Sequence, residues 1–151
     1  MIEIIPQLYI SDIFGANDPD LIQKNNITHV ISLGCEADIS ENILNLKYLN
    51  IKDLPDQIII HTFDPCVKFI DEAMNHPSIK HNILVHCYYG QSRSASVVIA
   101  YLVENSHSKL NLNDAIDYLK AKKNDICINP GFLSQVNIIN SFYYSFYLAY
   151  F

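Results

Sequence analysis

A cysteine and an arginine lie close together near the middle of the chain, in the run His86-Cys87-Tyr88-Tyr89-Gly90-Gln91-Ser92-Arg93-Ser94. Arg93 is the only arginine in the sequence, which uses lysine at every other strongly basic position. Arginine differs from lysine in presenting a rigid, permanently charged pair of donors that fits a phosphate group. A thiol, a short loop with a glycine and this guanidinium together predict a cysteine nucleophile that attacks a bound phosphoryl group.

The segment from Cys87 to Arg93 has the composition of a phosphate-binding loop. Gly90 permits a tight backbone in which several main-chain N–H groups converge on one point. The amides expected to do so belong to Tyr88, Tyr89, Gly90, Gln91, Ser92 and Arg93. A helix that starts at the end of the loop would direct its positive N-terminus at the same point. A dianionic phosphate and a thiolate are both favoured there, so we expect Cys87 to be ionised at neutral pH.

The side chains in and beside the loop suggest distinct roles. Arg93 would bind two phosphate oxygens and take up charge in the transition state. Ser94 would donate a hydrogen bond to the Cys87 sulfur and so ease its departure in a second chemical step. His86 is expected to orient the loop by hydrogen bonding and not to act as a base.

Two apolar segments must position this loop. Asn82–His86 contains Ile-Leu-Val, a short apolar run that is typical of a buried strand. The segment after Arg93, Ser-Ala-Ser-Val-Val-Ile-Ala-Tyr-Leu-Val, is apolar on nearly all sides and predicts a central, buried helix. The loop therefore falls at the carboxyl end of a strand and just before a helix, where ligands bind in open α/β sheets.

The rest of the chain alternates predicted strands and helices. Strands are expected at Ile4–Ile10, as an edge strand or hairpin around Pro6, and at Ile27–Leu33 and Leu46–Ile51. Helices are expected at Asp18–Asn25, along the stripe Phe63, Val67, Ile70 and Met74 with Thr62 or Asp64 as its cap, at Leu112–Lys123, and from Pro130 onward. This alternation predicts an α/β three-layer sandwich, in which helices flank a mostly parallel central sheet.

Length and composition narrow the class of protein. With 151 residues, 50% of them hydrophobic, the chain fits one folded domain that covers residues 1–151. A net charge of −6 argues against nucleic acid or an anionic membrane as the main partner. The cysteines are widely spaced, so neither a zinc ribbon nor a disulfide scaffold is indicated. No signal peptide is visible. A reducing intracellular compartment is expected, the cytoplasm in the first place, with the nucleus also compatible.

The pattern His86-Cys87-x5-Arg93-Ser94, with Ser92 before the arginine, resembles that of the cysteine-dependent dual-specificity protein phosphatases. Further segments that resemble this family are Ile4–Ile10, Ile27–Ile31 and the stretch with Asn129-Pro130, Phe132-Leu133 and Gln135. The resemblance implies a two-step hydrolysis of a phosphoprotein substrate. A thiolate forms a phosphocysteine while an aspartic acid protonates the leaving oxygen, and the aspartate then activates water. It implies no metal or other cofactor.

The resemblance also implies where the general acid lies. In the family, the acid precedes a helix-starting phenylalanine by ten residues, and counting back from Phe63 gives Asp53. Asp56 is the alternative. Its other interpretation is a solvated turn residue after Pro55.

The loop departs from the family pattern at Tyr89, because the residue before the loop glycine is usually small, often alanine. The Tyr89 ring could line a pocket, crowd the entrance or, like Tyr88, point outward. The loop interior carries no lysine, which favours a phosphoprotein substrate, on tyrosine or serine/threonine, over inositol lipids and RNA 5′ ends. A catalytically weak phosphate-binding module of the same fold is the alternative function, and Tyr89 keeps it open.

The C-terminal stretch, residues 141–151, is unusually aromatic. It is too short to span a bilayer, and we expect it to end the final helix and pack on the core. A contact surface for self-association is the second interpretation, since exposed aromatic patches mark contacts. The sequence leaves the oligomeric state open.

Overall fold

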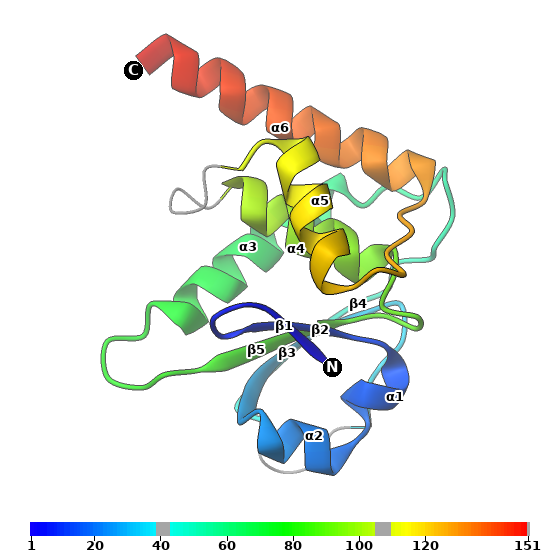
Figure 1. Ribbon diagram of the computed structural model, residues 1–151, viewed down its shortest axis with the longest axis vertical. Coiled ribbons are helices and arrows are strands. Elements are labelled where there is room, and N and C mark those ends of the chain that lie inside the picture. The colour runs from blue at the N-terminus through cyan, green and yellow to red at the C-terminus, as the bar shows by residue number, and fades with distance from the viewer. Residues whose placement is uncertain (39–42, 105–109, 151) are drawn as a thin grey trace.

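A five-stranded sheet lies at the centre of the structure, a computed structural model that describes residues 1–38, 43–104 and 110–150. Side chains within these ranges are described except those of residues 45 and 142–150. The strands follow the order β1 (Ile2–Ile5), β2 (Leu8–Ser11), β5 (Asn82–His86), β3 (Ile27–Leu33) and β4 (Asn45–Leu49). β1 and β2 form an antiparallel hairpin, and the other neighbouring pairs are parallel. The carboxyl ends of the parallel strands therefore share one edge, at the right in Figure 1.

Helices cover both faces of this sheet. On one face lie α1 (Ile13–Ala16) and α2 (Pro19–Lys24), and on the other lie α3 (Ile60–Met74), α4 (Arg93–Glu104), α5 (Leu112–Lys122) and α6 (Pro130–Tyr150) (Figure 1). This arrangement confirms the predicted α/β three-layer sandwich with a mostly parallel sheet. The sequence does not reveal α1, because a four-residue helix shows no apolar period. Asp12 starts it by accepting a hydrogen bond from the Gly15 N–H at 2.7 Å.

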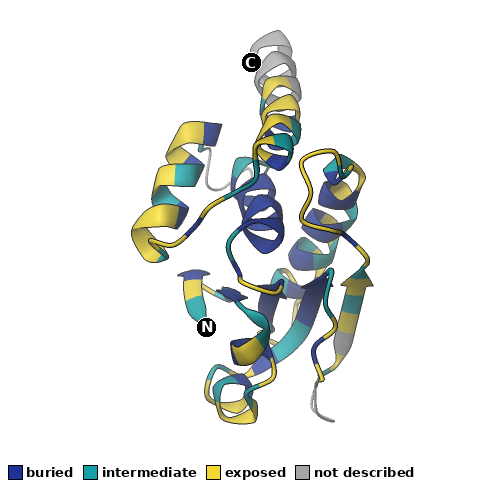
Figure 2. Cartoon of the chain, turned by 90° about the vertical axis from the view of Figure 1, so that its right-hand side faces the viewer, coloured by how far each residue is buried: buried dark blue, intermediate teal, exposed yellow. Residues whose placement is uncertain are grey.

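α4 is the central helix of the larger helical layer. Every residue from Arg93 to Leu102 is buried, as the apolar sequence predicts, and Figure 2 shows this helix enclosed by the other elements. α4 packs against α3, α5 and α6. Phe63 and Phe132 are fully buried in the same core, and truncating either one to alanine would cost about 3–5 kcal/mol of stability. The helix that begins after Ser92 is therefore held by packing on several sides.

The end of β4 differs from the prediction. The strand was expected to reach Ile51 but ends at Leu49. The Ile51 N–H donates to the Leu49 carbonyl at 2.9 Å, and the Ile51 carbonyl accepts from Arg93. Ile51 therefore leaves the sheet because both of its main-chain groups are used outside the strand ladder.

The start of α3 also differs from the prediction. Neither Thr62 nor Asp64 caps the helix, which begins at Ile60 without a side-chain cap of its own. Instead, the Oε1 atom of Gln135 in α6 accepts hydrogen bonds from the N–H groups of Ile59 and Ile60, at 2.8 and 3.0 Å. A contact between distant segments thus satisfies donors that a local cap was expected to satisfy.

The last helix, α6, continues to Tyr150. The aromatic stretch at the C-terminus therefore extends this helix, as expected. The expected packing of this stretch on the core concerns side chains after Ser141, which lie outside the described residues. None of the helices in the described part of the chain is both long and apolar enough to cross a membrane.

Candidate active site

The segment Cys87–Ser92, here called the phosphate loop, joins β5 to α4 at the carboxyl edge of the sheet. This edge faces the viewer in Figure 2. Gly90 has a φ of 67°, in the left-handed region that glycine tolerates. A Cβ at this position would lie 2.7 Å from the Ser11 carbonyl. Glycine is therefore needed here for the backbone angle and for the close approach to β2, and the predicted tight bend is present.

The carbonyl groups of the phosphate loop point away from its centre. The Tyr88 carbonyl accepts from the first N–H of α1 at 3.1 Å, and the Gln91 carbonyl accepts from the Cys127 N–H at 3.1 Å. In a trans peptide the next N–H points the opposite way, so the following amides point inward. The Ser92 carbonyl accepts from the first turn of α4 at 2.8 Å, which leaves the Arg93 N–H at the open N-terminus of that helix. These three carbonyls are thus bonded to groups outside the loop, and the convergence of all the loop amides on one point stays a prediction.

Cys87 is the first residue of the phosphate loop, with 1% of its surface exposed. Its Sγ accepts a hydrogen bond from the Gly90 N–H at 3.2 Å and lies 3.2 Å from the Ser94 Oγ. Ser94 is fully buried in the first turn of α4, so its hydroxyl is held beside the sulfur. Both contacts stabilise a thiolate when the hydroxyl is the donor. The contact that the sequence predicts between Ser94 and Cys87 is present.

Arg93 is buried at the first position of α4, with 8% of its surface exposed. Its Nη1 donates to the Ile51 carbonyl at 3.2 Å. Gly34 makes room for this contact, since its φ is 72° and a Cβ there would lie 2.1 Å from both atoms. The Arg93 Nε is buried without a hydrogen-bond partner among the described residues, and Asp53 Oδ2 lies 3.9 Å from it. A buried, charged donor without a partner, beside inward amides, suits a bound oxyanion.

Asp53 reaches the phosphate loop from the segment between β4 and α3, residues 50–59, here called the Asp53 loop. Its Oδ1 accepts from the Ser92 Oγ at 2.8 Å and from the Asn129 Nδ2 at 2.6 Å. The Asn129 N–H in turn donates to the Ser92 Oγ at 3.2 Å. Among the described residues, this hydrogen-bonded group includes Asp53 but not Asp56, which is exposed. The structure thus brings the first of the two candidate acids to the loop.

Two members of this group have side-chain contacts that the sequence did not reveal. Ser92 was expected to contribute its main-chain amide only, and Asn129 was noted only as part of a resembling segment. Asparagine before proline does signal a helix start, and the Asn129 Oδ1 accepts from the Phe132 N–H at 2.9 Å. The second role of Asn129 is invisible in the sequence because Asp53 lies 76 residues away.

The Asp53 loop rests on the start of α6. The Gln135 Nε2 donates to the Gln57 carbonyl at 2.9 Å. Gly131 allows close contact, since a Cβ there would lie 1.8 Å from the Pro55 carbonyl oxygen. Together with the contact of Asn129, these interactions fix the backbone that carries Asp53.

His86 supports the phosphate loop from the end of β5. It is fully buried, and its Nε2 lies 2.6 Å from the Ser32 Oγ of β3. Burial lowers the pKa of His86 to about 4, so the ring is neutral near pH 7 and a weak base. This position agrees with the supporting role predicted for His86. Ser32 was not singled out, although a serine in the apolar end of a strand is a recognisable signal.

Tyr88 and Tyr89 lie on the outside of the phosphate loop. They are 45% and 64% exposed, and their rings form a T-shaped pair with centroids 4.8 Å apart. The Tyr89 ring is therefore not packed inside the phosphate loop. Gln91 also turns outward, and its Nε2 donates to the carboxylate of Asp125 at 3.1 Å.

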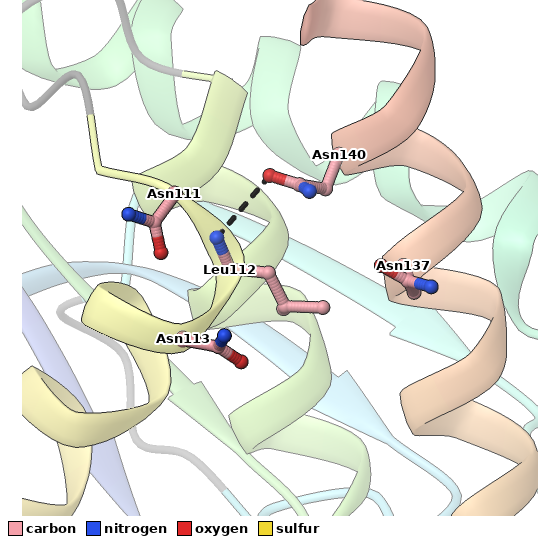
Figure 3. Close-up of a pocket in the computed structure, with 5 residues that line it drawn as sticks. All are labelled: Asn111, Leu112, Asn113, Asn137 and Asn140. Carbon is pink, nitrogen blue, oxygen red and sulfur yellow. Dashed lines mark hydrogen bonds between the residues drawn. The ribbon is translucent and has the colours of Figure 1, made fainter.

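A separate hollow of about 330 Å³ lies between the start of α5 and α6 and contains none of the predicted site residues. Its lining consists of one leucine and four asparagines, namely Leu112, Asn111, Asn113, Asn137 and Asn140. Figure 3 shows the Asn140 side chain accepting from the Leu112 N–H, at 3.2 Å. This contact fixes the first turn of α5 against α6.

Residues 8–141 match a family model described as dual specificity phosphatase, catalytic domain. The chain is 31% identical over 140 residues to Dual specificity protein phosphatase MPK-4 of Drosophila melanogaster, an alignment that covers 90% of this chain and 35% of that protein. It is also 31% identical to Dual specificity protein phosphatase 1B of Arabidopsis thaliana, over 89% of this chain and 78% of that protein. The chain thus spans only about a third of the first relative and most of the second.

Two solved structures resemble the whole fold. The human tyrosine phosphatase-like serine/threonine/tyrosine-interacting protein has a TM-score of 0.86 at 29% identity, and the alignment covers 95% of this chain and 97% of that chain. The structure of DUSP15 has a TM-score of 0.84 at 30% identity, with coverage of 93% and 86%.

Proposed function

The chain belongs to the dual specificity phosphatase family, and we propose that it hydrolyses phosphotyrosine and/or phosphoserine/threonine in proteins through a phosphocysteine. One observation supports this proposal above the others. The Asp53 carboxylate accepts a hydrogen bond from Ser92 and lies 3.9 Å from the Arg93 Nε, so a carboxyl group joins the cation and the thiol at one loop. These are the groups that a nucleophile, a phosphate binder and a general acid require.

In the first step, the Cys87 thiolate attacks phosphorus, and a sulfur–phosphorus bond forms as the bond to the ester oxygen breaks. The Asp53 carboxyl group gives its proton to the departing oxygen. The guanidinium of Arg93 and the inward amides of the phosphate loop bind the phosphoryl oxygens and stabilise the charge that they gain in the transition state.

In the second step, the Asp53 carboxylate takes a proton from water, whose oxygen attacks phosphorus. The sulfur–phosphorus bond breaks, inorganic phosphate leaves and the Cys87 thiolate is restored. Ser94, 3.2 Å from the sulfur, donates a hydrogen bond to the departing thiolate and so makes it a better leaving group. Asp53 thereby regains the proton that it needs for the next turnover.

The proposal is tested by turnover of p-nitrophenyl phosphate and binding of vanadate, with the natural chain and with Cys87→Ser. Removing a nucleophile lowers turnover by about 10⁵–10⁶-fold, so the variant should show none above background. It should still bind the oxyanion, because the amides and Arg93 remain. Cys66→Ser is the matched control, since this thiol is buried in α3 away from the loop. Full turnover by Cys87→Ser would contradict the proposal.

A phosphate-binding interaction module remains the second candidate function. Two observations favour it: the bulky Tyr89 beside the loop glycine, and the similarity to a human protein described as phosphatase-like and interacting. The same assay separates the two functions. A chain that binds a phosphopeptide but never releases phosphate is a module, and one that releases phosphate is an enzyme.

We further propose that residues 1–151 form one catalytic domain that works in a reducing intracellular compartment, with the cytoplasm favoured. A thiolate nucleophile must remain unoxidised to react. All four cysteines are free thiols in the structure, as in proteins of reducing compartments. Imaging of the tagged full-length protein in cells tests this assignment, and a secreted protein would contradict it.

A further inference from the structure

Exposed aromatic rings lie in the phosphate loop and in the helix bonded to it. Tyr88 and Tyr89 contact each other and leave 45% and 64% of their surfaces exposed. Phe14, which is 73% exposed, belongs to α1, and the first N–H of α1 donates to the Tyr88 carbonyl. Two of these three rings thus belong to the phosphate loop itself, and the third to the short helix that is hydrogen bonded to it. Tyrosine faces of this kind attract cationic groups, the guanidinium of arginine above all.

The segments around the loop are also rich in acid. Besides Asp53, the segments that contact the loop, α1 or Arg93 carry the carboxylates of Asp12, Asp38, Asp56 and Asp125, and Glu36 follows two residues after Gly34, which lies against Arg93. Asp12 precedes α1, and its backbone N lies 2.9 Å from the position of a Cβ on Gly90. The Asp38 N–H donates to Asn17 at the end of α1, and Gln91 donates to Asp125.

Few cations balance these carboxylates at the surface. Arg93 is buried and directed at the phosphate site. Lys123 donates to the carboxylate of Asp125, and Lys52, in the Asp53 loop, is exposed and has no ion pair among the described residues. The phosphoryl group of a substrate would thus contact hydrogen-bond donors in the loop. The substrate residues that flank the phosphorylated residue would contact carboxylates and aromatic rings.

The three aromatic rings and the carboxylates named above are here called the rim. We propose that the rim selects substrates in which a cationic residue, arginine above all, lies next to the phosphorylated residue. The phosphoryl group enters the phosphate loop, the guanidinium stacks on the Tyr88–Tyr89 pair, and the surrounding carboxylates attract it. The same carboxylates repel a substrate with acidic neighbours. This inference rests on the proposed function for its reaction, but the recognition that it describes is a matter of binding.

Three phosphotyrosine peptides that differ only in their flanking residues, which are arginine, alanine or glutamate, test the inference with the natural chain. We expect kcat/KM to be about tenfold higher for the arginine peptide than for the glutamate peptide, and the difference to shrink in high salt. Dissociation constants of the same peptides for Cys87→Ser are measured in parallel. Equal values for all three peptides, or a preference for glutamate, would overturn the inference.

This design separates the inference from the function on which it rests. If p-nitrophenyl phosphate is not hydrolysed, the proposed enzyme activity fails, and the order of the peptide dissociation constants still tests the rim. If p-nitrophenyl phosphate is hydrolysed but the peptides are not distinguished, the activity stands and the rim proposal falls.

Two sets of variants divide the rim into its parts, and each is judged by the arginine-to-glutamate ratio. Tyr89→Leu keeps the bulk but removes the aromatic face, so the ratio should fall about threefold. The pair Glu36→Gln and Asp38→Asn should lower the ratio at low salt only. The pair Glu72→Gln and Asp117→Asn, exposed on α3 and α5, makes the same change in net charge and should leave the ratio intact. An unchanged ratio in Tyr89→Leu, or an equal fall in the control pair, would contradict the proposal.

Discussion

The phosphate loop and the Asp53 loop carry the two halves of the proposed chemistry, but they are built in different ways. The phosphate loop joins β5 to α4 with Cys87, Gly90 and Ser92 buried, and its shape follows from main-chain hydrogen bonds and the left-handed Gly90. The Asp53 loop is largely exposed, with Leu54 and Ile58 48% and 59% exposed. It is held by side chains of the α6 region that lie 76 to 78 residues further along the chain.

This difference separates binding from proton transfer. Residues adjacent in sequence form the proposed oxyanion site, so that site is fixed wherever the sheet and α4 are folded. Asp53, the proposed general acid, reaches its place only where α6 docks on the Asp53 loop. Damage to the first loop should therefore remove binding and turnover together, whereas damage to the second should remove turnover and leave binding.

The largest effect is expected from Gly90→Ala. The new methyl group would lie 2.7 Å from the Ser11 carbonyl on a backbone with positive φ, so the loop cannot keep its shape. Turnover of p-nitrophenyl phosphate should fall roughly 1,000-fold, and vanadate binding should be lost with it. Steady-state kinetics and isothermal titration measure both, and circular dichroism checks that the variant is folded. A folded variant that binds vanadate normally would contradict the account of this loop.

The next effect is expected from Asp53→Asn, which removes the proposed acid without changing its shape. The rate constant kcat should fall about 100- to 1,000-fold, while vanadate binding is kept. The loss should be greater for phenyl phosphate than for p-nitrophenyl phosphate, because the better leaving group depends less on a proton. Asp56→Asn is the matched control and should stay near the natural rate. A large loss in Asp56→Asn with a silent Asp53→Asn would reverse the assignment of the acid.

A smaller effect is expected from Gly131→Ala, which disturbs the Asp53 loop from outside. A Cβ on residue 131 would lie 1.8 Å from the Pro55 carbonyl oxygen, so the loop must move. A displacement of this size should lower kcat about 10- to 100-fold, with vanadate binding preserved. Ser134→Ala, at an exposed position one turn further along α6, is the control. If Gly131→Ala lost vanadate binding as fully as Gly90→Ala, the two loops would not be separable.

The smallest effect at neutral pH concerns His86, which lies at the end of β5 and contacts Ser32 of β3. Its pKa is about 4 in the fold and about 6.5 in an unfolded chain. The folded protein therefore binds fewer protons between these values, and its stability falls as the pH drops from 6.5 towards 4, by about 3 kcal/mol in total. The free energy of unfolding, measured with urea at several pH values, should depend less on pH in His86→Asn. His61→Asn, at an exposed position of α3, should keep the dependence of the natural chain. The same slope in both variants would contradict the assignment to His86.

The sequence predicted the phosphate loop well because its determinants are local. One short stretch contains the strand before the loop, the helix after it, and the residues Cys87, Arg93 and Ser94. Their order in the sequence therefore brings them together in the fold. The position of Asp53 came only from the spacing to Phe63 in a resembling family. Without that spacing, Asp53 and Asp56 look alike in the sequence, and only the contact with Ser92 tells them apart.

What the sequence could not predict depends on partners far along the chain. Gln135 replaces the cap expected at the start of α3, and the side-chain amide of Asn129 donates a hydrogen bond to Asp53. Ile51 lies outside β4, and its carbonyl accepts a hydrogen bond from Arg93 instead of joining the strand ladder. None of these choices follows from local propensity, since each polar group could be satisfied equally well by water or by a neighbour until the fold brings its partner near.

The position of the Arg93 side chain restricts which residues can stand at position 34. Gly34 stands in the turn after β3, far from the phosphate loop in sequence, yet even the smallest side chain there would occupy the site of the Arg93 Nη1. A lineage that exchanged Gly34 for alanine would have to move its guanidinium or the end of β4 at the same time. A glycine outside the phosphate loop is thus constrained by the arginine that it accommodates.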